Sequence, residues 1–166
     1  ANRVPPLKDD KILTDWNGLM IAALAEGARV LGQRRLKEAA EKAALFVLER
    51  LRDHHRLLHR YRQGQAAIPA TANDYAFLIT GLLALDQAAP GADWKTQAID
   101  LQRAMTDLFW DRDHGGYFLT AGDQTELPVR PKELYDGAIP SANSVALHNL
   151  ATLAEIIASL IKAERE

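Results

Sequence analysis

Apolar side chains recur every three or four residues along most of the chain, which is the spacing of helices that bury one face. Thr14 or Asp15 is suited to cap the first such segment, and Gly32 is suited to end it. The pattern predicts five helices, at about residues 16–31, 36–51, 74–88, 94–109 and 141–162.

The five predicted helices differ in how much of their circumference is apolar. The segments at 36–51 and 94–109 each have a single apolar stripe, which is typical of a helix with one face in solvent. The segment at 74–88 is apolar nearly all round, and those at 16–31 and 141–162 are also dense in apolar residues. The order along the chain is therefore buried, amphipathic, buried, amphipathic, buried.

The buried segments begin alike. An acid followed by an aromatic residue, and then by Leu and a large aliphatic residue, occurs at 15–20 and again at 74–79. The segment at 143–147 fits the same frame without the aromatic residue. Repeated helix pairs stack into a solenoid or close into a ring. In either arrangement the buried helices run parallel, and their N-termini share one rim.

Two long connections, at 54–73 and 111–140, lead to that rim, whereas those at the opposite end, 32–35 and 89–93, are short. Long connections in compact domains are usually functional or disordered. We therefore expect the rim with the long connections to be the working face. The segment 115–119 predicts a short β-excursion near 115–130.

Composition supports an all-α domain. Ala and Leu greatly outnumber the β-branched residues, which excludes an all-β fold, and 166 residues suit one domain over residues 1–166. A net charge of −2 gives no reason to expect a nucleic-acid partner. Because there is no cysteine, disulfides, cysteine–zinc sites and thiol chemistry are excluded within this chain.

Signals for export or membrane insertion are absent. The first six residues lack the apolar core of a signal peptide. The longest stretch without a charged side chain, 139–154, contains Pro140 and several polar residues, whereas a spanning helix needs about 20 mostly apolar residues. We expect a cytoplasmic protein with no membrane partner and no cofactor.

The predicted rim gathers carboxylates, amides, hydroxyls and aromatic rings, which suit a sugar-like polyol through hydrogen bonds and stacking. Glu133 and Asp136 precede the last helix and are not needed as its caps, so with Asp74 they are the candidate catalytic acids and bases. Helix dipoles should keep Asp15 and Asp74 ionised. The substrate-binding candidates are Asp15, Trp16, Asn17, Tyr75, Ser141 and Asn143.

A purely structural role remains an alternative for several of these residues. Asp15, Asp74 and Ser141 stand at helix starts, where their side chains are good caps. Capping accounts for their positions but not for the aromatic residue that recurs after the acid.

Metal sites are less well supported. His55 and His59 are four residues apart, but no third zinc ligand is evident, and Leu57 and Leu58 between them indicate a turn or the entry to a strand. The segment starting at Asp111 resembles the opening of a calcium loop, yet it lacks the third acid and the closing Glu. We predict no metal site.

Several motifs together resemble one family, the thioredoxin-domain-containing family that includes spermatogenesis-associated protein 20 and its bacterial relatives. They cover most of the chain in the family's order. The motifs are DDKILTDWNGLMI at 9–21, DYAFLI at 74–79, GGYF at 115–118 and KELYDGAIPSANS at 132–144.

The resemblance implies a fold rather than a reaction. In that family a thioredoxin-like domain precedes an (α/α)6 toroid similar to N-acylglucosamine 2-epimerases and six-hairpin glycosidases, and this chain resembles about five helices of the toroid. Asn73 and Ala142 depart from the family's usual Asp and Gly. The epimerases use histidines for proton transfer, and no histidine begins a predicted buried helix here; His148 lies one turn inside and reads as a core residue.

Two functional hypotheses follow. In the first, the ring binds or converts a carbohydrate-like substrate at the rim. In the second, it is a non-catalytic scaffold for a thioredoxin-like domain. Free, inward-facing carboxylates would favour the first, and carboxylates engaged as helix caps would favour the second. A run of hairpins without its ring neighbours exposes two apolar flanks, so we also expect self-association.

Overall fold

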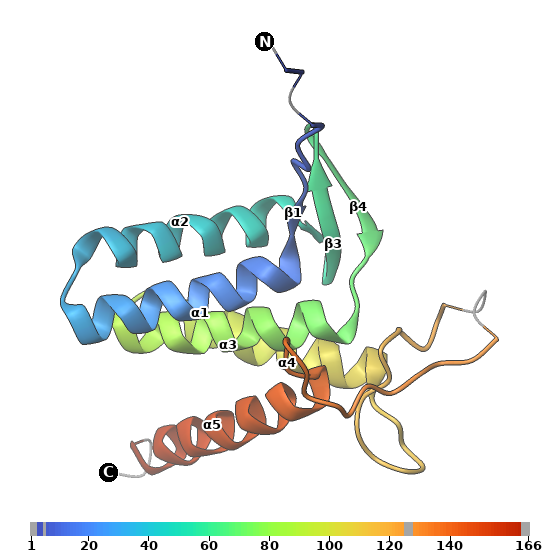
Figure 1. Cartoon of the computed structure of the whole chain (residues 1–166). Coiled ribbons are helices and arrows are strands. Elements are labelled where there is room, and N and C mark those ends of the chain that lie inside the picture. Colours follow the sequence, from blue (N-terminus) through green and yellow to red (C-terminus); the bar gives the residue numbers. More distant parts are fainter. Residues whose placement is uncertain (1–2, 5, 125–127, 164–166) are drawn as a thin grey trace.

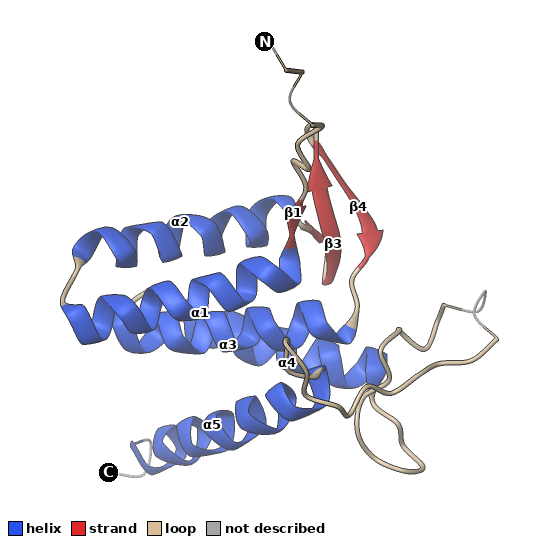
Figure 2. Ribbon diagram, in the orientation of Figure 1, coloured by secondary structure: helices blue, strands red, loops and turns tan. Residues whose placement is uncertain are grey.

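The computed structural model describes residues 3–4, 6–124 and 128–163, and the fold of this part of the chain is mainly helical (Figures 1 and 2). Each predicted helix is present, with ends within two residues of those expected. The helices are α1 (Thr14–Leu31), α2 (Arg34–Arg50), α3 (Ala72–Ala88), α4 (Trp94–Phe109) and α5 (Ala142–Ala163). The strands are β1 (Ile12–Leu13), β2 (Arg52–Asp53), β3 (Arg56–Arg62) and β4 (Gln65–Pro69).

Helices α1, α3 and α5 run in the same direction, while α2 and α4, which alternate with them along the chain, run in the opposite direction (Figure 1). Helix α3 is central, because it packs against both α1 and α5. The starts of α1, α3 and α5 therefore lie at one end of the molecule, as the repeat predicted. The two long connections lie at that same end and the short ones at the other (Figure 2).

Glycines allow α1 and α3 to approach closely. A Cβ atom on Gly18 would lie 2.5 Å from the backbone nitrogen of Leu78, and one on Gly81 would lie 2.8 Å from the carbonyl oxygen of Gly18. Real Cβ atoms do not come this near to backbone atoms, so larger residues at these positions would force the helices apart. The close crossing holds the starts of α1 and α3 beside each other.

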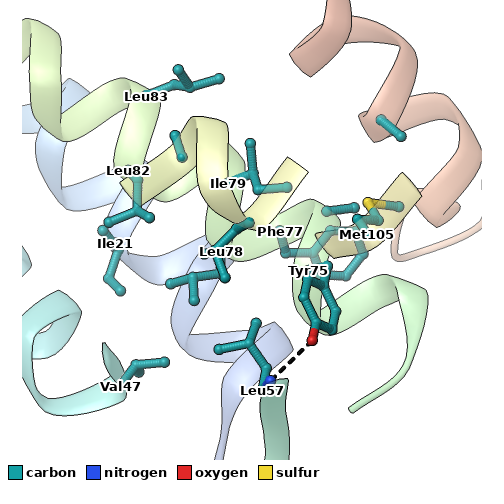
Figure 3. Close-up of a cluster of buried hydrophobic side chains, with 14 of the residues drawn as sticks. Ile21, Val47, Leu57, Tyr75, Phe77, Leu78, Ile79, Leu82, Leu83 and Met105 are labelled. Carbon is teal, nitrogen blue, oxygen red and sulfur yellow. Dashed lines mark hydrogen bonds between the residues drawn. The ribbon is translucent and has the colours of Figure 1, made fainter. Parts of the chain in front are cut away.

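The hydrophobic core is centred on α3, whose residues from Tyr75 to Ile79 are all buried. Around them lie Ile21 of α1, Val47 of α2 and Met105 of α4 (Figure 3). The Tyr75 hydroxyl accepts a hydrogen bond of 2.9 Å from the backbone N–H of Leu57, which ties the β3 strand to the core.

The connection at 54–73 forms an antiparallel hairpin of β3 and β4, with Arg62 opposite Gln65. Gln63 and Gly64 both have positive φ, as a two-residue hairpin turn requires. β1 pairs with β3 on the other side. This hairpin carries most of the sheet, although the sequence suggested only a strand entry here.

The β-excursion predicted near 115–130 is smaller than expected. In the described part of this segment, the β-pairing is one isolated bridge, between Trp110 and Tyr117; residues 125–127 lie outside the described residues. Hydrogen bonds from side chains organise the rest. The Lys132 ammonium group binds the Asp111 carboxylate and the Gly115 carbonyl oxygen, and residues 112–114 form a turn.

Helix α5 is long and apolar enough, by length and composition alone, to cross a membrane over Ala142–Lys162. Glu155 interrupts this segment, so the longest stretch without a charged side chain ends at residue 154. In the protein, α5 packs against α3: the Asn149 side chain, 3% exposed, donates to the Ala76 carbonyl oxygen at 2.8 Å and accepts from the Thr80 hydroxyl.

Candidate functional site

The carboxylate of Asp74 is fully buried at the start of α3 and joins two helix starts. One oxygen accepts the backbone N–H of Asp15 in α1 at 3.0 Å. The other accepts the backbone N–H of Thr71 at 2.7 Å and the Thr71 hydroxyl at 3.0 Å. Thr71 and Asp74 form a capping box on α3. The capping interpretation of Asp74 is therefore confirmed, and the same group also holds α1.

His59 of β3 completes this cluster. Its Nδ1 atom lies 2.9 Å from the Asp74 carboxylate, and the imidazole is 26% exposed. Two contacts hold β3 beside the start of α1: the Thr14 hydroxyl donates to the Leu58 carbonyl oxygen at 2.6 Å, and Leu13 pairs with Arg60. A histidine thus lies close in space to the starts of α1 and α3, although no histidine stands at the start of either helix in the sequence.

The contact with Asp74 determines the chemistry of the imidazole. Because a carboxylate is an acceptor, Nδ1 carries a proton, and in the neutral ring Nε2 is the basic nitrogen. The hydrogen bond to Asp74 raises the pKa of His59 above its usual value of 6.5. The pair therefore resembles the carboxylate–histidine arrangement that orients a proton-transfer group.

Asp15 brings a second carboxyl group to the cluster. Its side chain is half-buried, and one of its oxygens accepts the backbone N–H of Trp16 at 2.7 Å. Burial, and secondarily the nearby Asp74 carboxylate, raise the pKa of Asp15 above its usual value. These two effects oppose the helix dipole, from which we predicted an ionised Asp15. The expectation that Asp15 caps α1 is wrong: α1 has no side-chain cap, and Asp74 binds its first turn instead.

Side-chain atoms of Asp15, His59 and Asp74 that could bind a metal lie within 4.8 Å of one another. The hydrogen bonds argue against a shared ion, because those from Asp15, Thr71 and His59 already occupy both Asp74 oxygens. With both oxygens engaged, Asp74 orients the imidazole of His59 through its hydrogen bond to Nδ1 and does not itself bind a metal. Two remaining ligands are fewer than a stable site uses.

The two aromatic candidates differ in access. Trp16 is 60% exposed beside Asp15, so its ring is available to a ligand. Tyr75 is 1% exposed, packs on Phe109 and binds Leu57, so its proposed role in stacking on a substrate is wrong. The side-chain amide of Asn17 donates to the Leu13 carbonyl oxygen and so belongs to the start of α1.

Asp136 is a helix cap, contrary to the expectation that it is not needed as one. Its carboxylate accepts the backbone N–H of Ser141 and the hydroxyl of Ser144, each at 2.9 Å. The Ser141 hydroxyl accepts the backbone N–H of Ser144, so Ser141 also caps α5. These hydrogen bonds hold the pKa of Asp136 below its usual value. Asp136 therefore acts on α5 in this structure.

Glu133 and Asn143 lie at the start of α5 as well. The Glu133 side chain is exposed, and its carbonyl oxygen accepts the Asn143 amide at 2.9 Å. Asn143 also bonds both backbone groups of Tyr117. Asp74 lies in the first turn of α3 and Asp136 binds Ser141 just before α5, and the starts of these two helices lie at the same end (Figure 1). Within the described residues, however, the structure records no hydrogen bond or ion pair between the Asp15–His59–Asp74 cluster and Glu133 or Asp136.

The sequence pattern did not indicate His59 as a proton-transfer residue. The available signal was a histidine two residues from Leu57 and from Tyr61, which places all three side chains on the same, core-facing side of one strand. Only the pairing of β1 with β3 brings this strand to the start of α1.

Sequence comparison identifies relatives. No family model matches the chain. The chain is 39% identical to spermatogenesis-associated protein 20 of Homo sapiens in an alignment of 163 positions that covers 92% of the chain. The match covers 21% of the human protein, so the chain spans about a fifth of the length of this relative. The resemblance found in the motifs is therefore confirmed for that part.

Solved structures identify the fold. Cellobiose 2-epimerase from Spirochaeta thermophila matches with a TM-score of 0.68 at 21% identity, over 86% of this chain and 38% of the epimerase. A UGL variant described with dGlcA-Glc-Rha-Glc matches with a TM-score of 0.64 at 20% identity, over 87% of this chain and 40% of the variant. The architecture is that of consecutive α-hairpins in an (α/α)6 toroid, as expected.

Proposed function

We propose that this chain, a relative of spermatogenesis-associated protein 20 with the fold of six-hairpin carbohydrate enzymes, binds a carbohydrate-like substrate at the helix-start rim and transfers protons there through His59. The observation that carries the proposal is the 2.9 Å contact between His59 Nδ1 and Asp74. This contact orients the imidazole and leaves Nε2 as the atom that can exchange a proton with a ligand.

The other groups of the cluster fit this reaction class. A raised pKa suits Asp15 to donate a proton to a carbonyl oxygen while His59 takes one from the adjacent carbon. Trp16 offers an exposed ring beside them, against which a sugar can stack. In this step a C–H bond breaks, its electron pair enters the new C=C bond of an enediol, and the carbonyl oxygen receives the proton of Asp15.

Hydrolysis by two carboxylates fits less well. That chemistry needs two carboxyl groups free to act on opposite sides of a glycosidic bond. Asp74 is buried and engaged by four donor groups, and Asp136 is held by the start of α5. Proton transfer at a carbon beside a carbonyl group needs only the imidazole and one acid.

A scaffold role for a thioredoxin-like domain is the second candidate function. It is favoured by the capping hydrogen bonds of Asp74 and Asp136, which by themselves explain why acids stand at these helix starts. Capping of α3 does not by itself require the partly exposed His59 on the buried carboxylate of Asp74. The proton-transfer function is therefore preferred.

The test is proton exchange in D2O. The protein is incubated with cellobiose or glucose, and the signal of the sugar's C2 proton is followed by NMR. We expect it to decrease with wild-type protein and with His55→Gln, a matched change at an exposed histidine near the same strand, and to persist with His59→Gln. Exchange that survives in His59→Gln would contradict the role of His59. Absence of both exchange and sugar binding in the wild type would favour the scaffold.

A further inference from the structure

The pairing of β3 with β4 places Ile68 directly opposite His59. The pairs on either side of them are Leu58 with Pro69 and Arg60 with Ala67. Residues directly opposite each other on paired strands project to the same face of the sheet, with their Cβ atoms about 4.5–5.5 Å apart. In a regular hairpin the isoleucine side chain would therefore lie beside the imidazole of His59.

The backbone of Ile68 does not continue the strand in the regular way. Its φ is 70°, in the left-handed region. A β-branched side chain makes this region unfavourable, and the following residue, Pro69, favours an extended backbone instead. Ile68 therefore holds a conformation that the local sequence disfavours, and the surrounding structure must impose it.

The exposure of the β4 side chains shows the effect of this torsion. Because alternate residues of a strand share a face, Ala66, Ile68 and Ala70 would all be expected to point toward the core. Ala70 is 4% exposed and Ala66 packs against the core, whereas Ile68, the largest and most apolar of the three, is 52% exposed. The left-handed backbone thus turns the isoleucine side chain outward, away from the face that His59 shares.

Two hydrogen bonds fix the backbone just after Ile68. The Ala70 N–H donates to the Leu57 carbonyl oxygen at 3.2 Å. The Ala72 N–H, at the start of α3, donates to the Leu119 carbonyl oxygen at 3.0 Å. Because the pairing with β3 also holds β4 before Ile68, the torsion at Ile68 is where the chain adjusts between the hairpin and α3 (Figure 1).

We propose that Ile68 is a positioning residue, whose left-handed backbone keeps the imidazole of His59 open to a substrate. The imidazole is held by Asp74 at Nδ1 and is 26% exposed. An extended Ile68 would gain burial against it and would cover it. The protein instead carries an unfavourable torsion and an exposed apolar side chain, and the space beside the proton-transfer group stays free for the carbon of a sugar.

Acylation by diethyl pyrocarbonate, which modifies accessible neutral imidazoles, measures access to His59 without any sugar. Proline cannot take a positive φ, so Ile68→Pro should place its ring beside the imidazole; proline is tolerated on an edge strand such as β4. We expect the acylation rate of His59, followed by mass spectrometry, to fall severalfold, while that of the exposed His55 stays the same. An unchanged rate at His59 in a variant with the wild-type circular dichroism spectrum would overturn the proposal.

Ile68→Gly tests the same point in case the proline variant does not fold. Glycine takes a positive φ readily, so we expect His59 to be acylated at the wild-type rate and the urea midpoint to be kept or raised. Ala66→Gly, on the same strand, is the matched control and should lower the midpoint, because glycine weakens a regular strand. Faster acylation of His59 in Ile68→Gly would mean that the isoleucine already covers the imidazole, which contradicts the proposal.

The consequence for proton transfer rests on the proposed function. In Ile68→Pro we expect exchange of the sugar's C2 proton to fall together with acylation, while an NMR titration shows the pKa of His59 still above 6.5, since Asp74 keeps its contact. A pKa that returns to 6.5 would mean that the substitution breaks this pair, and Ile68 would then have only a structural role. If the wild type shows no exchange but acylation follows the expected pattern, the proposed function fails and the role of Ile68 in access to His59 stands.

Discussion

At the residue scale, Asp74 shows that a helix cap and a chemical group can be the same side chain. Its buried carboxylate accepts the Thr71 N–H of its own helix, the Asp15 N–H of the neighbouring helix, and the His59 imidazole. Capping and a functional role do not exclude each other here, because the four lone-pair sites of a carboxylate allow both. What capping excludes is a free Asp74 that attacks a substrate.

The His59–Asp74 pair predicts how stability changes with pH. Because folding raises the pKa of His59, the folded state binds more protons than the unfolded state above pH 6.5. The stability from this pair is fully present below pH 6.5 and is lost as the pH rises through the raised pKa. We expect the urea midpoint to fall across this range in the wild type and less in His59→Gln. Equal slopes in the two proteins would contradict the pairing.

At the element scale, α1 and α5 each receive hydrogen bonds at their starts from groups outside their own first turn. Helix α1 has no side-chain cap of its own and uses Asp74, whereas α5 uses Asp136 from the preceding connection. Asn143 then fastens α5 to Tyr117. The long connections therefore stabilise helix starts, besides lying at the proposed binding rim.

Replacing Asp136 tests its assignment to α5. Asp136→Ala leaves the N–H of Ser141 without its acceptor, and loss of a cap costs about 1 kcal/mol. We expect a free energy of unfolding lower by about that amount, with sugar-dependent proton exchange retained. Glu133→Ala, an exposed acid in the same connection, is the control and should leave stability unchanged. Loss of exchange without loss of stability would return Asp136 to the candidate catalytic residues.

At the scale of the whole molecule, the packing of α3 against α1 differs from its packing against α5. On the α1 side, Gly18 and Gly81 permit backbone contact. On the α5 side, a cavity of about 380 Å³ lies between the helices and is lined by Thr80, His148 and Asn149, among others. Among the three parallel helices, α1 and α3 therefore pack tightly, whereas α3 and α5 pack less closely.

The close crossing predicts an unequal effect of two glycine substitutions in α1. Gly18→Ala would place a methyl group 2.5 Å from the backbone of α3, and overpacking of this kind costs about 1–3 kcal/mol. Gly27→Ala meets only the end of the Leu36 side chain at 3.3 Å, and its gain in helix propensity offsets this contact. We expect denaturant unfolding to show a large loss for Gly18→Ala and little change for Gly27→Ala. Comparable losses would contradict the crossing.

The sequence by itself determined the five helices, their alternation of buried and amphipathic faces, and the common direction of α1, α3 and α5. The helices and their faces depend on periodicity within one or two turns, which local spacing records, and their common direction follows from the repeated helix pairs. The tertiary structure alone decided which side chains meet. His59 reaches Asp74 through the pairing of β1 with β3, Tyr75 turns into the core, and Asp136 reaches Ser141. Such contacts depend on how separate elements pack, and because many side chains at a helix start can serve equally as cap or ligand, local pattern cannot choose between the two roles.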